Sequence, residues 1–349
     1  MKKNLPNTFI LGAPKSGTTS LAAYIDEHPN VFISKPKEPF YWSHDYPELK
    51  RRHDMNSLEK YLSLFQSASS EHQVIGEGST NYLRSEVAIE EIMKFNPNAK
   101  FIAMLRNPVE VVHAFHAEVL FSFIETEPDF EKAWAMQDDR NRGGQIPEGC
   151  EAPQFLQYRQ VASYYQQVER LMRSVPEDQR MVIVFDDFKA DCASTFQEVL
   201  RFLDLPKFEK TDFPRVNAAH GHRFPALSKL VLNPPSWLAP AVDVIRKSLR
   251  GRNGFVAKIK SNLRKPQRRT DLREEFRAQL CQEFSAEVRK LGQLLDRDLS
   301  HWVEVEGQNF DESANATFIN ASQSPVPVSK EPVLSSGPVA TLTTSEQIL

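Results

Sequence analysis

The sequence predicts a single α/β domain with a central parallel β-sheet flanked by helices. Its short apolar runs do not alternate with polar residues, which is typical of strands buried on both faces. Stretches with helical periodicity separate these runs, as in a parallel sheet covered by helices. A turn of small residues joins the first apolar run to the first helical stretch, and such a turn favours anion binding.

Each strand is predicted from an apolar run between polar or turn-forming residues, and each helix from apolar residues three or four positions apart. The expected strands are residues 9–13, 31–33, 73–76, 100–105 and 181–185. The first helical pattern lies at 21–25, and further helices are expected at 57–66, 85–95, 108–123, 153–174, 192–203 and 271–295. The last helix repeats apolar residues from Leu272 to Leu291 at helical steps.

Two segments depart from this alternation. Residues 125–153 are polar, acidic and Gly-containing without periodicity, so we expect a lid or binding loop there, with a plain connection as the alternative. From Glu306 onward Ser, Thr, Pro and Val dominate, which predicts a disordered tail. The predicted division is therefore a domain over residues 1–305 and a disordered tail over 306–349.

Composition and charge narrow the class of protein. The 349 residues carry 43 Lys and Arg against 46 Asp and Glu, a net charge of −3, so the basic excess of a general nucleic-acid binder is absent and no nucleic-acid partner is expected. The three cysteines are scattered and form no C-x-x-C pair, which indicates a reducing compartment. Neither a signal-peptide pattern nor an apolar window of about 18 residues is found, so we expect a cytoplasmic protein.

The turn at residues 12–20 has the composition of a phosphate cradle. Gly12 and Gly17 have the spacing of a Walker A motif, but the two residues after Gly17 are threonines and the lysine stands inside the loop, at Lys15. The strand at 100–105 is followed by an arginine rather than by the acidic residue of a Walker B motif, so a site for a triphosphate with Mg²⁺ would lack a carboxylate for the metal there. Asp186 and its neighbour Asp187 remain an alternative Walker B pair.

The loop PKSGTT at residues 14–19 resembles the 5′-phosphosulfate loop of sulfotransferases that use 3′-phosphoadenylyl sulfate (PAPS). The resemblance implies a catalytic role for Lys15 at the bridging oxygen of the leaving phosphate and no metal ion. It also implies that Lys15, Ser16, Gly17, Thr18 and Thr19 bind the donor. This agrees with elementary chemistry, because a cation already aimed at the leaving oxygen stabilises the charge that develops there.

A second stretch, FIAMLRNPVE at residues 101–110, resembles the element of the same family that binds the 3′-phosphate. Arg106 is the implied ligand of that phosphate. The family usually carries a serine eight residues after the arginine, and here that position is Ala114, which predicts one fewer hydrogen bond to the donor. His113 and His116 flank this position and are either phosphate ligands or packed side chains.

Two further segments resemble parts of the acceptor site. KPKEPFYW at residues 35–42 is similar to the segment that supplies the catalytic base in the carbohydrate branch of the family, which implies that Glu38 is the base. The alternative is a solvated glutamate in a Lys-Glu run. GEGSTNYL at residues 76–83 resembles a family strand end, from which Glu77 or Tyr82 is expected to line the acceptor site.

Residues 244–270 contain ten basic residues and no acidic one. This stretch is expected to bind an anionic acceptor, the 3′-phosphate or an anionic membrane surface, the alternative being a solvated basic surface.

The resemblance implies a P-loop-like sulfotransferase fold and a PAPS-dependent sulfotransferase. The expected enzyme moves the sulfuryl group from PAPS to a hydroxyl or amine of a carbohydrate, glycolipid or small molecule and releases 3′,5′-ADP. The alternatives are a P-loop nucleotide kinase or NTPase and a non-catalytic module that binds a nucleotide or polyanion. Neither the acceptor nor the oligomeric state has a readable pattern in the sequence.

Overall fold

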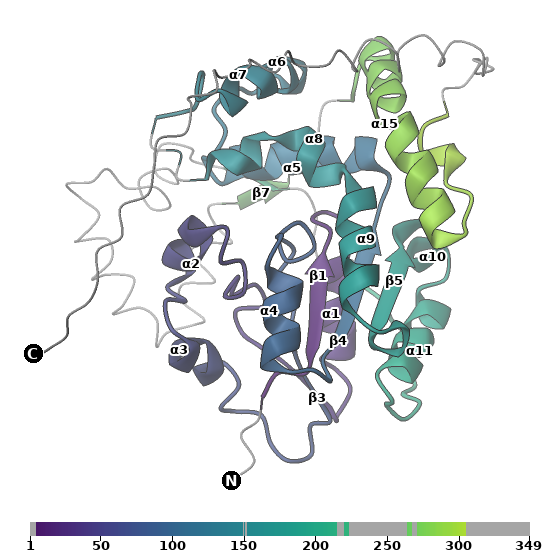
Figure 1. Ribbon diagram of the computed structural model, residues 1–349. Helices are drawn as coiled ribbons and strands as arrows, with labels where there is room; N and C mark the ends of the chain where they lie inside the picture. Colours follow the sequence, from purple (N-terminus) through teal and green to yellow (C-terminus); the bar gives the residue numbers. More distant parts are fainter. Residues whose placement is uncertain are drawn as a thin grey trace, which may run out of the picture. The chain divides into compact units, whose positions relative to one another are not determined.

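A computed structural model describes residues 5–148, 150, 152–214, 220–222, 264–266 and 271–304. These residues belong to one compact unit in which helices surround a central sheet (Figure 1). None of the helices in this part of the chain is long and apolar enough to cross a membrane. The predicted tail at 306–349 and most of the basic stretch at 244–270 lie outside the described residues, so both stay predictions.

The central sheet has five parallel strands in the order β2-β3-β1-β4-β5. Their bounds are β1 Thr8–Gly12, β2 Val31–Ile33, β3 Val74–Glu77, β4 Lys100–Leu105 and β5 Arg180–Val184. The expected strands are thus confirmed to within a residue. Because β1 lies between β3 and β4, the loops that follow these three strands meet at one edge of the sheet.

The helices connect the strands and cover the sheet. They are α1 Thr18–Ile25, α2 Pro47–His53, α3 Leu58–Ser63, α4 Ala88–Phe95, α5 Pro108–Phe121, α6 Phe130–Ala135, α7 Gln137–Asn141, η1 Pro153–Leu156, α8 Tyr158–Ala162, α9 Tyr164–Ser174, η2 Glu177–Gln179, α10 Phe185–Ala190, α11 Cys192–Phe202, α15 Glu274–Leu295 and η3 Ser300–Trp302. A short antiparallel pair, β6 His220–His222 and β7 Arg264–Pro266, stands apart from the central sheet.

Alternate residues of the inner strands build two separate cores. Phe9 and Phe101 belong to the core under α4, α5, α8, α9 and α15, whereas Ile10 and Ile102 belong to the core under α1, α10 and α11. Successive side chains of a strand point to opposite faces, so a strand with both faces covered must be apolar throughout. This explains the unalternated runs in the sequence.

Two expectations about helices were wrong. The single helix expected at 153–174 is three pieces, η1, α8 and α9, because the backbone turns out of the helical conformation at Gln157 (ψ 72) and Ser163 (ψ 82). The segment at 125–153, expected to lack regular structure, contains α6 and α7. Helices of six and five residues are too short to display a repeat in the sequence.

Candidate active site

The loop between β1 and α1 requires glycine at both ends. Gly12 has φ 136, and a Cβ atom there would lie 2.6 Å from the carbonyl oxygen of Thr80. Gly17 has φ 91, and a Cβ atom there would lie 3.0 Å from the Phe185 ring. A side chain would be strained by the positive φ at both positions, and at Gly12 it would also clash with the backbone of Thr80.

The loop ends at an uncapped helix N-terminus. Gly17 is the N-cap of α1, and among the described residues no side chain accepts a hydrogen bond there. The first turn of α1 carries no acidic residue. Its N–H groups and the positive end of the helix dipole are thus left for an anion. Ser16 is fully buried beside them, and its hydroxyl donates a long hydrogen bond to the carbonyl oxygen of Pro14 at 3.3 Å.

The two cations predicted to bind the donor lie together. Arg106, at the end of β4, donates from Nη1 to the backbone oxygen of Lys15 at 3.0 Å. The Arg106 guanidinium also lies over the Phe185 ring, 4.9 Å from its centroid. Since β1 and β4 are neighbours in the sheet, the loops that follow them converge, and the structure joins the two predicted donor elements.

Each of these cations is paired with a glutamate of α5. Lys15 Nζ lies 3.0 Å from Glu118 Oε2, and Arg106 Nε donates to Glu110 Oε2 at 2.8 Å. The Glu118 and Glu110 side chains are 48% and 43% exposed. Ion pairs that are open to water contribute little stability, so a phosphate dianion can compete for both cations.

Glu38, the expected base, is held by two groups. Lys37 Nζ lies 2.8 Å from Glu38 Oε1 and also donates to the Gly78 carbonyl oxygen at 2.9 Å. Thr80 Oγ1 donates to Glu38 Oε2 at 3.4 Å. Thr80 is also the residue against which Gly12 packs, so Glu38 lies beside the start of the phosphate loop.

Glu77 and Tyr82 do not line an acceptor site, because both are completely buried. The hydroxyls of Tyr82, Tyr61 and Ser79 donate to the Glu77 carboxylate at 2.7, 3.1 and 2.7 Å. Burial raises the pKa of Glu77 to about 7, against the opposing effect of the three hydroxyls and Lys37. The expectation failed because a strand end in the middle of the sheet is covered on both faces.

The Glu77 cluster instead fixes the segment that follows Glu38. The backbone N–H of Phe40 donates to Ser79 Oγ at 3.0 Å, and the backbone N–H of Trp42 donates to the Tyr82 hydroxyl at 3.2 Å. The aromatic residues after Glu38 are therefore anchored to the end of β3.

His116 is a packed side chain rather than a phosphate ligand. It is 3% exposed, contacts the rings of Phe130 and Tyr158, and its Nε2 lies 2.9 Å from the Glu127 carbonyl oxygen. Burial lowers its pKa, which favours the neutral imidazole. His113 stacks on Phe130 at 5.5 Å between centroids. Both rings thus pack against the first residue of α6.

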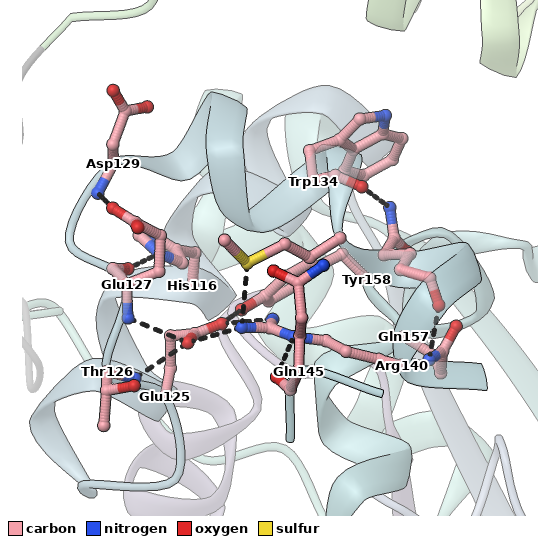
Figure 2. A network of polar contacts seen from close by, with 12 residues as sticks. His116, Glu125, Thr126, Glu127, Asp129, Trp134, Arg140, Gln145, Gln157 and Tyr158 are labelled. Atoms are coloured by element: carbon pink, nitrogen blue, oxygen red, sulfur yellow. Dashed lines mark hydrogen bonds and ion pairs between the residues drawn. The ribbon is translucent and has the colours of Figure 1, made fainter. Parts of the chain in front are cut away.

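A buried ion pair joins the start of the segment after α5 to α7 (Figure 2). Both carboxylate oxygens of Glu125 accept from Arg140, at 2.6 and 2.9 Å, and the two side chains are 0% and 2% exposed. The Tyr158 hydroxyl donates to the same carboxylate at 2.5 Å, and the backbone N–H groups of Thr126 and Glu127 complete its shell. Residues 125–127, α7 and α8 are consequently held together by one carboxylate.

The alternative Walker B acids are already engaged. Asp186 accepts from the indole N–H of Trp302 at 2.6 Å, and Asp187 pairs with Arg297. Trp302 and Arg297 both lie after α15, so the two carboxylates hold α10 against this last described segment and do not face a nucleotide.

A family model for the sulfotransferase domain matches residues 5–214. The chain belongs to the sulfotransferase domain family. The sequence is 32% identical over 108 residues to the membrane-associated sulfotransferase kil1 of Dictyostelium discoideum, covering 30% of this chain and 21% of that protein. It is 30% identical over 148 residues to human carbohydrate sulfotransferase 15, covering 32% and 26% of the two chains.

The fold of this sulfotransferase domain is also that of a solved relative. The crystal structure of a sulfotransferase from Alicyclobacillus acidocaldarius superposes with a TM-score of 0.62 at 24% identity and covers 86% of this chain and 99% of its own. The chain spans about a quarter of the length of the curated relatives named above.

Some residues of the site were not predicted from the sequence. Phe185 packs against both Gly17 and Arg106, and its place directly after a strand of the same sheet was an available signal. Glu118 and Thr80 had no such signal. Nothing in the sequence of α5 shows that Glu118 pairs with Lys15, and nothing in the polar turn shows that Thr80 packs against Gly12.

Proposed function

We propose that this sulfotransferase-family protein transfers the sulfuryl group from PAPS to a hydroxyl or amine of an acceptor and releases 3′,5′-ADP. The observation that carries this proposal is the position of Lys15. It lies inside a loop that ends at an uncapped helix N-terminus, and Arg106 binds its backbone oxygen. This arrangement offers two cations and a row of N–H groups to a bisphosphorylated nucleotide.

The residues of the loop fit a donor phosphate. The two glycines leave the space that a Cβ atom would fill, and the first-turn N–H groups of α1 lack a cap among the described residues. In the proposed site Ser16, Thr18 and Thr19 bind the 5′-phosphate and Arg106 binds the 3′-phosphate. Bound PAPS supplies a sulfuryl group activated by its attachment to phosphate.

The chain's own groups then have defined tasks. Lys15 exchanges Glu118 for the leaving phosphate and stabilises the negative charge on its bridging oxygen as the sulfur–oxygen bond breaks. Glu38 takes the proton of the attacking hydroxyl or amine. Lys37 keeps the Glu38 carboxylate in one orientation through its second contact with Gly78.

We propose a carbohydrate as the acceptor class, with glycolipids and small molecules as the alternatives. The support is the name of carbohydrate sulfotransferase 15, to which this chain is similar over 148 residues. Cytoplasmic location and binding of an anionic surface by residues 244–270 stay predictions from the sequence.

A kinase or NTPase is less well supported. The residue after Gly17 is a threonine where Walker A carries lysine, and Asp186 and Asp187 are occupied by Trp302 and Arg297. If the protein binds a nucleotide but catalyses no reaction, the remaining alternative is a non-catalytic nucleotide-binding module.

Two measurements test the proposal. Thermal unfolding is followed with 3′,5′-ADP in EDTA and with ATP plus Mg²⁺, and labelled PAPS is then offered with a panel of sugar, glycolipid and phenol acceptors. We expect stabilisation by 3′,5′-ADP without metal, and label on a carbohydrate acceptor. Stabilisation by ATP with Mg²⁺ alone would favour the kinase.

A further inference from the structure

Tyr164 carries a buried hydroxyl that the fold itself does not use. The residue begins α9 and is 1% exposed. Its hydroxyl has no hydrogen-bond partner within the described residues. A buried polar group without a partner costs folding free energy, so such a group in a native structure calls for an explanation.

Two polar side chains of the phosphate site act on this hydroxyl. Burial raises the pKa of Tyr164 well above its ordinary value, while Arg106 and Ser16 lower it. Ser16 is near enough to lower the pKa of Tyr164, but no hydrogen bond of acceptable geometry joins the two hydroxyls. Ser16 spends its one proton on the Pro14 carbonyl oxygen, at the long distance of 3.3 Å.

Without a bound nucleotide, the Tyr164 hydroxyl therefore donates no hydrogen bond among the described residues, and the nearby Ser16 hydroxyl donates only a long one. A serine hydroxyl donates one hydrogen bond and accepts two. If Ser16 turns its proton from Pro14 toward a phosphate oxygen in the loop, its lone pairs rotate as well, and one of them can then face the Tyr164 hydroxyl. Both hydroxyls are then satisfied, and the Ser16 proton is held on the phosphate.

We propose that Tyr164 is a positioning residue for the donor: it donates to Ser16 Oγ when a phosphate occupies the loop and thereby orients the Ser16 proton toward that phosphate. This inference rests on the proposed function, because it requires a phosphate in the loop at residues 12–20. It adds to that function a residue from α9, far from the loop in sequence.

The neighbouring tyrosine offers a matched control. Tyr165 lies on the same helix, and its hydroxyl donates to Glu169 at 2.7 Å, away from the loop. Tyr165→Phe removes the same atom from the same turn without touching the proposed contact.

The experiment compares Tyr164→Phe, Tyr165→Phe, Ser16→Ala and the double variant Ser16→Ala/Tyr164→Phe in the full chain. Affinity for 3′,5′-ADP is measured by calorimetry, and the Tm is measured without nucleotide. We expect Tyr164→Phe to weaken 3′,5′-ADP binding by about 3- to 10-fold, the effect of one hydrogen bond, with an unchanged or higher Tm. The Ser16→Ala background should abolish this effect, and Tyr165→Phe should bind as the unchanged protein does.

The outcomes separate the inference from the proposed function. If the unchanged protein does not bind 3′,5′-ADP, the proposed function fails and the inference falls with it. If the unchanged protein binds but Tyr164→Phe binds equally well, only the inference is overturned. A lower Tm with unaltered affinity, or an undiminished loss in the Ser16→Ala background, overturns it as well, since both indicate a role that does not pass through Ser16.

Discussion

At the scale of single residues, the charges of the candidate site are arranged as exchangeable pairs. Lys15 pairs with Glu118 and Arg106 with Glu110, and the carboxylates of both pairs reach the solvent. Such pairs contribute little to stability, in contrast to a pair that is removed from water. The two cations are thus available to a ligand at small cost.

Replacing Lys15 tests the catalytic assignment. We expect Lys15→Ala to lower kcat by about 100-fold or more, because it removes a preorganised charge at the leaving oxygen. Turnover is measured at saturating PAPS, with Lys94→Ala as the control, since Lys94 is a largely exposed lysine paired with Glu91 on α4. Equal turnover of the Lys15 variant and the unchanged protein would contradict the assignment.

Replacing Glu118 tests the exchange of partners. Glu118→Gln is expected to tighten 3′,5′-ADP binding by about two- to fivefold, because the phosphate no longer competes with a carboxylate for Lys15. The gain should shrink at high salt, which screens the original ion pair. Calorimetric titration at two ionic strengths measures it, with Glu90→Gln on α4 as the control. Weaker binding by the Glu118 variant would show that this glutamate supports the donor instead.

Among the helices, α5 contacts the phosphate loop through Glu118, and a buried ion pair holds the segment that follows α5. The Glu125–Arg140 pair lies in the interior, and its hydrogen bonds reach α8 through Tyr158. Short helices with little intrinsic stability are thus held by one buried cluster rather than by their own sequence.

Breaking the Glu125–Arg140 pair should lower the stability of the whole domain. Arg140→Met leaves the Glu125 carboxylate buried without its cation, so we expect the free energy of unfolding to fall by about 3–5 kcal/mol. Arg142→Met is the matched control, because the Arg142 side chain is 71% exposed beside Asp139 and should cost less than about 1 kcal/mol. Urea unfolding of both variants measures the difference, and similar losses would contradict the buried network.

At the scale of the whole molecule, stability should depend on the protonation of Glu77. Its pKa is raised from 4.5 to about 7 by burial, so in the folded state it keeps its proton over a pH range in which the unfolded chain has released it. The folded state then binds more protons, and stability falls as pH rises between these values. Above about pH 7 both states are ionised and the loss is complete.

The measurement is the free energy of unfolding at pH 5, 6, 7 and 8 for the unchanged protein and Glu77→Gln. We expect the unchanged protein to lose up to about 1.4 kcal/mol per pH unit between pH 5 and 7 relative to the variant, because one pKa unit corresponds to that energy. Parallel curves for the two proteins would show that Glu77 is already ionised at pH 5.

Local patterns in the sequence were sufficient for the sheet and the phosphate loop. The strands were readable because burial on both faces requires apolar residues throughout, as in IAML before Arg106. The loop was readable because glycine at positions 12 and 17 is demanded by conformation within the loop itself. The short helices α6 and α7 were missed, because a buried contact between Glu125 and Arg140 stabilises them.

The fold class, the family and the loop with Lys15 could be predicted from the sequence, since all three depend on residues that are neighbours along the chain. The meeting of distant groups could be seen only in the folded chain: Arg106 lies at the backbone of Lys15, Glu118 at its side chain and Tyr164 near Ser16. The folded chain also shows that Glu77 is a buried anchor rather than an acceptor ligand. These contacts depend on the order of the strands and on which helix covers which face of the sheet, and no local pattern in the sequence encodes either.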